Sequence, residues 1–397
     1  MPASPALSAV RALPATPTLA NVPALPATAT LQWVNALPAT ATLPEVIVVP
    51  ATATLSAVRV LAVTESLATP RTLSGAAWVS VNRVKGGIDL GGTKVQAVIV
   101  DDRHEVVAEA KRPTPTEGGP PDVVARMAET VAEAAEAAGL HTSQLEGVGV
   151  GSPGAVDGET GVVGEARNLP GWDEPFALGP ALEEAVGIRT RLGNDVQVAV
   201  DGEFALGAGR DSSSLLGVWW GTGVGGGIIL DGKPWVGLGA AGEIGHVVVK
   251  QGGARCPCGR RGCMEAYAGR AAMELRARKL KKKGHHTKLF KIMEQRERNR
   301  LQSGIWARAL EAKDGMAIAL VDRAVEALGA GVASAVNVLD VETVVIGGGL
   351  GTRLGEPYVR RIEAAMLPHL FVSDRPPAVR LAALGDLGGA IGATLLV

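Results

Sequence analysis

The only cysteines of this chain fall within one short glycine-rich segment. Cys256, Cys258 and Cys263 are spaced C-x-C-x4-C, and His246 lies shortly before them. Three thiolates and one imidazole complete a tetrahedral zinc site without an open position, which is typical of a structural metal. The alternative is a chance gathering of buried thiols beside an unrelated histidine. We predict a zinc loop, so the fold must bring these four side chains together.

The composition excludes several classes of protein. With 397 residues, 47% of them hydrophobic, the chain is long enough to bury more than one core. Its formal net charge of −1 creates no general attraction to nucleic acid or to an anionic membrane. No apolar run reaches the roughly 20 residues that span a bilayer. Because the cysteines are assigned to a metal rather than to disulfides, we expect a soluble cytoplasmic protein without nucleic-acid or membrane partners.

Residues 1–83 differ from the rest of the chain. A Pro-Ala-Thr motif recurs there, for example within 25–31 and 37–43. The prolines break every apolar run, and the charged start of a secretory signal is missing, so neither a solenoid nor a signal peptide fits. We interpret this part as a disordered low-complexity tract, or as sequence upstream of a true start at Val81 or Val84.

Two segments share the plan of a strand, a glycine turn and a second strand. The first covers 87–100, and the second covers 215–230 with its turn at 221–227. Such glycines let phosphate oxygens approach the backbone. Each turn alone also fits an ordinary tight hairpin, but the pair predicts a duplicated α/β fold with a cleft between its halves. The first turn holds the following candidate phosphate and magnesium residues: Asp89, Gly91, Gly92, Thr93 and Lys94.

Hydrophobic periodicity and turn residues predict the remaining elements. We expect strands at 105–111, 145–151, 190–192 and 341–346, the last opening onto a third glycine turn at 347–350. We expect helices from the N-cap Asp122 to Gly139, at 180–186, 196–206, 266–300 and 316–338, and a small-residue helix from 388. The basic residues of 276–283 lack interleaved aromatic residues, which favours a solvated helix face over a nucleic-acid contact.

Three polar positions have both a structural and a functional interpretation. Asn168 and Trp172 share a loop. An amide and an aromatic ring suit sugar recognition. A turn that places a core tryptophan explains the same residues equally well. Asn194 and Asp195 lie between a strand and a helix. Such a pair often caps a helix, and the same strand end is also where a catalytic carboxylate is expected.

Taken together, the motifs over about 84–397 resemble the ROK family of sugar kinases and related repressors, within the actin-like ATPase superfamily. Residues 243–246 match the E-x-G-H signature, and 256–265 match C-x-C-G-x-x-G-C-x-E. The resemblance implies a two-domain, ribonuclease H-like α/β fold with an interdomain cleft. One domain would comprise 84–196 with the closing helix 386–397, and the other 197–385 with the zinc loop.

The same resemblance implies an activity, which is ATP-dependent phosphorylation of the 6-hydroxyl group of a hexose. Glucose is our first expectation, with N-acetylglucosamine, N-acetylmannosamine and mannose as alternatives and polyphosphate as an alternative donor. Asp195 would be the catalytic base, Mg²⁺ would act with ATP, and a homodimer is expected. Sugar hydroxyls would be bound by Asn168, Asn194, Asp195, Glu243, His246 and Glu265. Besides the first turn, the nucleotide would contact Gly221, Thr222, Gly223, Gly347, Gly348 and Gly349.

The family also suggests a second class of function, a sugar-responsive repressor. Family repressors have a helix-turn-helix domain before the first phosphate motif, and such a domain needs a basic recognition helix. In this chain Arg11 is the sole charged residue before Glu45. The sequence therefore favours the kinase.

Overall fold

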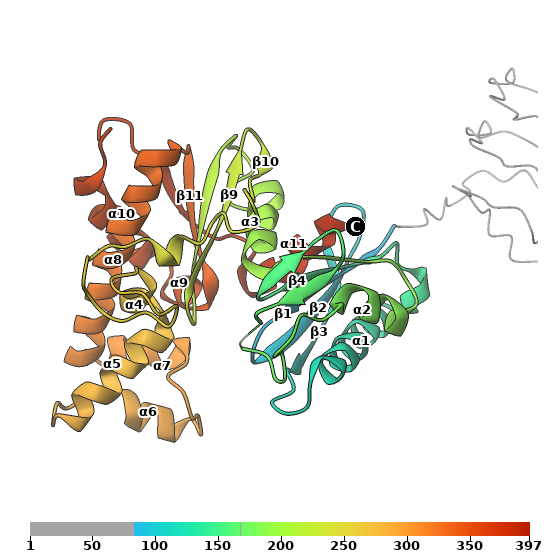
Figure 1. Ribbon diagram of the computed structural model, residues 1–397, viewed down its shortest axis with the longest axis horizontal. Helices are drawn as coiled ribbons and strands as arrows, with labels where there is room; N and C mark the ends of the chain where they lie inside the picture. The colour runs from blue at the N-terminus through green and yellow to red at the C-terminus, as the bar shows by residue number, and fades with distance from the viewer. Residues whose placement is uncertain (1–82, 167) are drawn as a thin grey trace, which may run out of the picture. The chain divides into compact units, whose positions relative to one another are not determined.

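The computed structural model describes residues 83–166 and 168–397 (Figure 1). The repeat of 1–82, its predicted disorder and the proposed start at Val81 lie outside the described residues, as does Arg167. Contacts unite Arg83–Val397 in one compact unit. The proposed domain division near 196 and the cleft stay predictions.

The first sheet has the strand order β3-β2-β1-β4-β7. β2 runs antiparallel to β1 and β3, whereas β1, β4 and β7 are mutually parallel. The strands are β1 (Lys85–Leu90), β2 (Lys94–Val100), β3 (Val106–Pro113), β4 (Val148–Ser152) and β7 (Thr190–Asn194). The predicted first hairpin and the strand that follows it are thus confirmed.

Helices cover both faces of this sheet, which explains why β2 is apolar at nearly every position. Ile99 packs in one core with Met127 of α1 (Pro120–Ala137), while Val98 packs with Ala390 of α11 (Gly388–Ala393) on the other face. α11 lies so close that a Cβ on Gly149 of β4 would meet the carbonyl oxygen of Ala393 at 1.7 Å. The closing helix therefore packs on the first sheet.

The second sheet repeats the order of the first as β10-β9-β8-β11-β12. β9 is antiparallel to β8 and β10, and β8, β11 and β12 are mutually parallel. The strands are β8 (Leu215–Trp220), β9 (Val224–Leu230), β10 (Lys233–Pro234), β11 (Thr343–Gly347) and β12 (Ala378–Leu381). The predicted duplication is confirmed, whereas β12 was not predicted as a strand.

The second glycine turn is shorter than predicted. β9 begins at Val224, so only 221–223 forms the turn and the later glycines belong to the strand. Their role is packing, because a Cβ on Gly225 would lie 2.8 Å from Val196, and one on Gly227 would lie 2.8 Å from Val200. These strand glycines admit α3 (Asp195–Leu206) against β9.

Two other helix predictions need correction. Gly119, not Asp122, is the N-cap of α1, because prolines follow it at the first helical positions; the Asp122 carboxylate accepts a hydrogen bond from Gly119 N at 2.9 Å. Residues 266–300 form several helices, since Gly269 separates α4 (Glu265–Ala268) from α5 (Arg270–Lys282) and Gly284 adopts a φ of 90° beyond α5. Within the described residues, no helix is both long and apolar enough to cross a membrane.

The remaining elements complete the two halves. The 25-residue α8 (Gly315–Leu339) confirms the predicted long apolar helix, with Asp314 as its N-cap. A short hairpin, β5 (Ala155–Asp157) with β6 (Val162–Gly164), precedes α2 (Leu178–Val186). The other helices are α6 (Leu289–Gln295), α7 (Ser303–Glu311), α9 (Gly348–Leu354) and α10 (Glu356–Met366).

Candidate functional site

The junction of β7 and α3 holds the Asn194-Asp195 pair. Asn194 caps α3, because its Oδ1 atom accepts hydrogen bonds from Val196 N at 3.1 Å and Gln197 N at 3.2 Å. The capping interpretation of this residue is therefore confirmed. Since the side-chain oxygen is occupied, a sugar hydroxyl would have to use the Nδ2 amide group of Asn194, one N–H of which donates to Gly154 O at 3.5 Å.

Asp195 begins α3 and has an altered acidity. Burial and the nearby carboxylates of Asp89 and Glu243 raise its pKa to about 6, although a hydrogen bond from Val196 N at 2.9 Å opposes the rise. A carboxylate with a pKa near neutrality is suited to accept a proton. These charges also show that three predicted site residues from separate segments lie near one another.

The first glycine turn lies beside Asn168. Gly91 N bonds to Lys94 O at 2.9 Å and closes the turn, and a Cβ on Gly92 would meet the Asn168 carbonyl oxygen at 2.9 Å. At the end of β1, burial raises the pKa of Asp89, and the positive charge of Lys94 partly offsets that rise. The structure thus brings a predicted sugar residue to the predicted phosphate turn.

Trp172 does not join this group. Its side chain is buried in the core of the first half, its Nε1 atom donates to Val163 O at 2.9 Å, and Phe176 packs edge-on against its ring. The interpretation of Trp172 as a sugar platform is therefore wrong. The loop places a core tryptophan instead.

The second glycine turn contacts both the zinc loop and the third glycine segment. Gly221 N bonds to Gly223 O at 3.0 Å, and Val224 N donates to Glu265 Oε2 at 3.0 Å. A Cβ on Gly221 would lie 4.0 Å from Gly349 N, at the beginning of α9. The predicted nucleotide residues 221–223 and 347–349 are therefore neighbours, and Glu265 is tied to the second turn.

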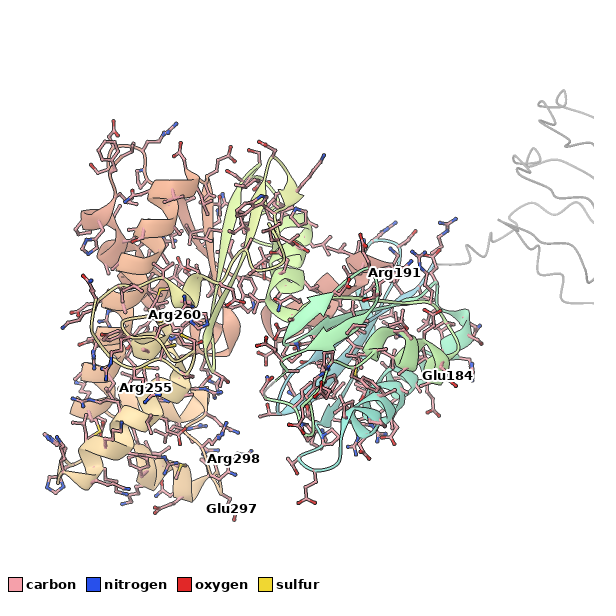
Figure 2. The ribbon with its side chains drawn as sticks, viewed as in Figure 1. Glu184, Arg191, Arg255, Arg260, Glu297 and Arg298 are labelled. Atoms are coloured by element: carbon pink, nitrogen blue, oxygen red, sulfur yellow. The ribbon has the colours of Figure 1, made fainter. Side chains whose placement is uncertain are left out.

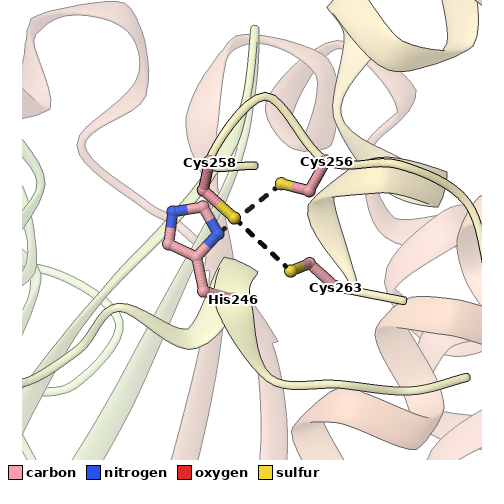
Figure 3. A group of neighbouring side chains, drawn as sticks. All are labelled: His246, Cys256, Cys258 and Cys263. Carbon is pink, nitrogen blue, oxygen red and sulfur yellow. Dashed lines mark hydrogen bonds between the residues drawn. The ribbon is translucent and has the colours of Figure 1, made fainter. Parts of the chain in front are cut away.

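The four predicted zinc ligands form one cluster (Figure 3). Their ligand atoms lie within 4.8 Å of one another, with Cys258 Sγ 3.7 Å from Cys263 Sγ and Cys256 Sγ 3.8 Å from His246 Nδ1. Neighbouring sulfur atoms about 2.3 Å from one zinc ion lie roughly 3.8 Å apart. The cluster is therefore compatible with zinc.

Two groups outside the cluster modify its donors. His246 Nε2 lies 3.8 Å from a Glu243 carboxylate oxygen, so a carboxylate faces the ring nitrogen that does not face the cysteines. A hydrogen bond from Arg260 N lowers the pKa of Cys258 to about 6, which favours a thiolate. Arg255 and Arg260 of this loop are exposed to solvent (Figure 2).

One residue near the second turn was missed. Arg270, the first residue of α5, donates from Nη2 to Thr222 Oγ1 at 2.6 Å. In the sequence it is simply the first cation after the cysteine signature. Only the tertiary fold reveals the contact.

Two kinases are similar in sequence to this chain. The chain is 35% identical to a glucokinase of Thermotoga maritima over 271 residues, which cover 68% of this chain and 83% of that protein. It is 30% identical to the N-acetylgalactosamine kinase AgaK of a Shewanella species over 319 residues, 78% of this chain and 95% of that protein.

A solved structure is also similar. It is a ROK family glucokinase from Streptomyces griseus in complex with glucose and AMPPNP, with a TM-score of 0.67 and 29% identity. The match covers 79% of this chain and 99% of that one. The model of the ROK family matches residues 85–397. This chain therefore belongs to the ROK family.

Proposed function

We propose that this sugar kinase transfers the terminal phosphoryl group of ATP to the 6-hydroxyl group of glucose. The observation that carries the proposal is Asp195, a carboxylate of raised pKa at the start of α3, close to Asp89 and Glu243. The similarity to glucokinases supports glucose as substrate and ATP as donor.

Asp195 would act as the general base. Phosphoryl transfer proceeds through a loose transition state, so the protein mainly positions the hydroxyl group, accepts its proton and stabilises phosphate charge. Asp195, unprotonated above a pH of about 6, takes the proton of the 6-hydroxyl group as its oxygen attacks phosphorus. Asn194 fixes the start of α3 and hence the backbone of this base.

The glycine turns would bind the phosphates. Backbone N–H groups of both turns, with the Thr93 and Thr222 hydroxyl groups and the Lys94 ammonium group, suit phosphate oxygens. Asp89, aided by the turn, would hold hydrated Mg²⁺, which when bound screens the phosphate charge. Lys94 Nζ is held by Gln96 Oε1 at 2.5 Å, which directs the ammonium group.

The zinc loop would order the sugar-binding groups. Zinc held by His246 and the three cysteines supplies a structural crosslink. Glu243 faces His246, and Glu265 lies between the cysteines and the second turn, with Cys256 Sγ 3.7 Å from Glu265 Oε1. Both carboxylates are thereby held in place for sugar hydroxyl groups before the sugar arrives.

A second candidate substrate is an N-acetylhexosamine. Similarity to an N-acetylgalactosamine kinase favours it, and N-acetylglucosamine and N-acetylmannosamine belong to the same substrate class. The difference concerns the second carbon of the sugar, where an acetamide group needs more space than a hydroxyl group. The homodimer and the cytoplasmic location stay predictions.

A coupled ADP-release assay of the full zinc-loaded chain tests the proposal. Mg-ATP is supplied with a panel of hexoses and N-acetylhexosamines, and polyphosphate replaces ATP in a parallel series with sugar phosphate as readout. We expect turnover with glucose and ATP that Asp195→Asn abolishes. If only an N-acetylhexosamine is turned over, it replaces glucose as the proposed substrate. If folded, zinc-containing protein phosphorylates no sugar in either series, the kinase mechanism is refuted.

A further inference from the structure

The second glycine turn is held by the first residues of α5. Arg270 N donates to Gly221 O at 3.1 Å, and Ala271 N donates to Thr222 O at 3.0 Å. The Arg270 side chain adds the bond from Nη2 to Thr222 Oγ1. The start of α5 therefore fixes the carbonyl groups of Gly221 and Thr222 and the Thr222 hydroxyl group.

The Arg270 guanidinium group has no carboxylate of its own. Its Nε atom is buried and has no hydrogen-bond partner among the described residues. Glu274 lies near enough to influence it, but the two carboxylate oxygens of Glu274 already accept from Arg278 Nη2 at 2.6 Å and from Leu301 N at 2.9 Å. Arg300 adds a further positive charge nearby. Arg270 and Arg300 thus place positive charge near the turn, where the Glu265 carboxylate is bound to Val224 N rather than to Arg270.

The contact with Arg270 also determines what the Thr222 hydroxyl group can do. A guanidinium group only donates hydrogen bonds, so Thr222 Oγ1 must be the acceptor in this pair. The hydroxyl proton of Thr222 then points to another acceptor, and Thr222 itself is exposed to solvent. A phosphate oxygen at the turn is such an acceptor.

We propose that Arg270 is a positioning residue for the polyphosphate group of the nucleotide. It directs the Thr222 hydroxyl group as a donor toward the terminal phosphates and places a cation without a dedicated counterion behind them. This inference rests on the proposed kinase function, because that function puts phosphates at the second turn.

Binding of ATP and of AMP to the full chain tests this role, measured by calorimetry without sugar. In Arg270→Ala, we expect the Kd for ATP to rise about tenfold or more, because a hydrogen bond to a charged group is lost together with a cation. The Kd for AMP and the KM for sugar should change by less than about twofold. Arg276→Ala removes an exposed guanidinium group from the same helix. This control variant should match the native protein in the Kd for ATP, the Kd for AMP and the KM for sugar.

Variants of Thr222 separate positioning from structural support. Thr222→Val should weaken ATP binding, whereas Thr222→Ser should retain it. The effects of Arg270→Ala and Thr222→Val on the Kd for ATP should be less than additive, because both act through one hydroxyl group. Added guanidinium ions should partly restore ATP binding to Arg270→Ala alone. Equal losses of ATP and AMP affinity, or full additivity without rescue, would show a merely structural role.

The outcome can be distinguished from failure of the proposed function. If the native chain phosphorylates no sugar but its ATP affinity still depends on Arg270, the kinase proposal fails and the role of Arg270 stands. If the native chain is an active kinase and Arg270→Ala has native ATP affinity and KM for ATP, only the role of Arg270 is refuted.

Discussion

The two sheets have the same strand order but differ in what their turns and connections contain. In the first half, the charged residues Asp89 and Lys94 lie at the strand ends that flank the turn between β1 and β2, and a single α-helix, α1, connects β3 to β4. In the second half, the turn after β8 has no charged residue, while the zinc loop and α4 to α8 lie between β10 and β11. One plan of backbone pairing therefore supports two different sets of side chains.

The difference separates the proposed reactive groups from groups that hold the glycine turn in place. Asp89 and Asp195, both attached to strands of the first sheet, have pKa values raised by burial. In the second half, Glu265 and Arg270 are committed to hydrogen bonds with the glycine turn. The first half thus contains buried carboxylates with raised pKa values, as catalytic sites often do, whereas Glu265 and Arg270 of the second half mainly hold the glycine turn.

The largest effect should come from the reactive half. Asp195→Asn removes the proposed base, so we expect kcat to fall about 10²- to 10⁴-fold with little change in sugar affinity. Asp201→Asn is the matched control, because Asp201 lies on the same helix, also has a pKa of about 6, and is held by Gln197 at 2.7 Å. Equal losses in both variants would mean that α3 is being disturbed rather than the base removed.

Breaking the zinc cluster should have the next largest effect, on sugar binding. Cys258→Ser removes one of four proposed ligands, so we expect loss of bound zinc and at least a tenfold higher KM for sugar, while the Kd for ATP changes less. Zinc content by mass spectrometry and steady-state kinetics measure these quantities. Arg255→Ala, an exposed change in the same loop, should keep zinc; a zinc-free Cys258→Ser protein with normal sugar KM would refute the coupling.

The pH dependence of kcat/KM gives a further test of Asp195, with a smaller expected effect. Asp195 must be ionised to act, so kcat/KM should be constant above a pH of about 6 and fall about tenfold per pH unit below it. The free energy of unfolding should change in the opposite sense and rise as the pH falls. Because the folded pKa exceeds the ordinary value near 4, the ionised group costs about 1–3 kcal/mol at pH 7. This cost declines as the pH falls below about 6 and vanishes only below about 4, where the unfolded group is protonated as well.

Asp195→Asn lacks this cost, so it should unfold at a higher temperature than the native protein at pH 7. Thermal unfolding of both proteins at pH 5 and pH 7 measures the difference. A native profile of kcat/KM that stays flat down to pH 5 would contradict the assignment of Asp195 as the base.

Local patterns in the sequence were enough to predict both hairpins and the cluster of His246 with the three cysteines. Alternating and continuous apolar runs around glycine turns locate β1, β2, β8 and β9, and the spacing of the cysteines limits them to one loop. The sequence did not reveal interactions determined by distant neighbours. The Arg270 contact joins positions 48 residues apart, the glycines of β9 are explained only by α3, and Trp172 was ambiguous until its core was known.

β12 and the start of α1 were missed for more local reasons. β12 has only four residues, too few for a periodic pattern, and it is recognised by its pairing with β11. At α1, Asp122 has the right chemistry for a cap, but the two prolines before it fit the first helical positions. The roles of the individual site residues stay predictions until variants are measured.

The smallest expected effect concerns the connection between the halves. Glu203, at the end of α3, is only 1% exposed. Its carboxylate accepts backbone hydrogen bonds from Ala208 N and Ala383 N at 2.9 Å and from Leu384 N at 2.8 Å. It thereby ties the chain leaving α3 to the segment that returns from β12 toward α11.

Glu203→Gln replaces one of these carboxylate oxygens by an NH₂ group, which cannot accept from a backbone N–H group. We expect the free energy of unfolding to fall by about 1–3 kcal/mol in denaturant titrations, with kcat at 25 °C within a few-fold of native. Glu184→Gln, an exposed change on α2, should alter stability by less than about 0.5 kcal/mol (Figure 2). If Glu203→Gln instead leaves stability unchanged but lowers kcat strongly, this carboxylate controls movement between the halves. Glu203 of α3 would then have to be counted among the groups that act in the reaction.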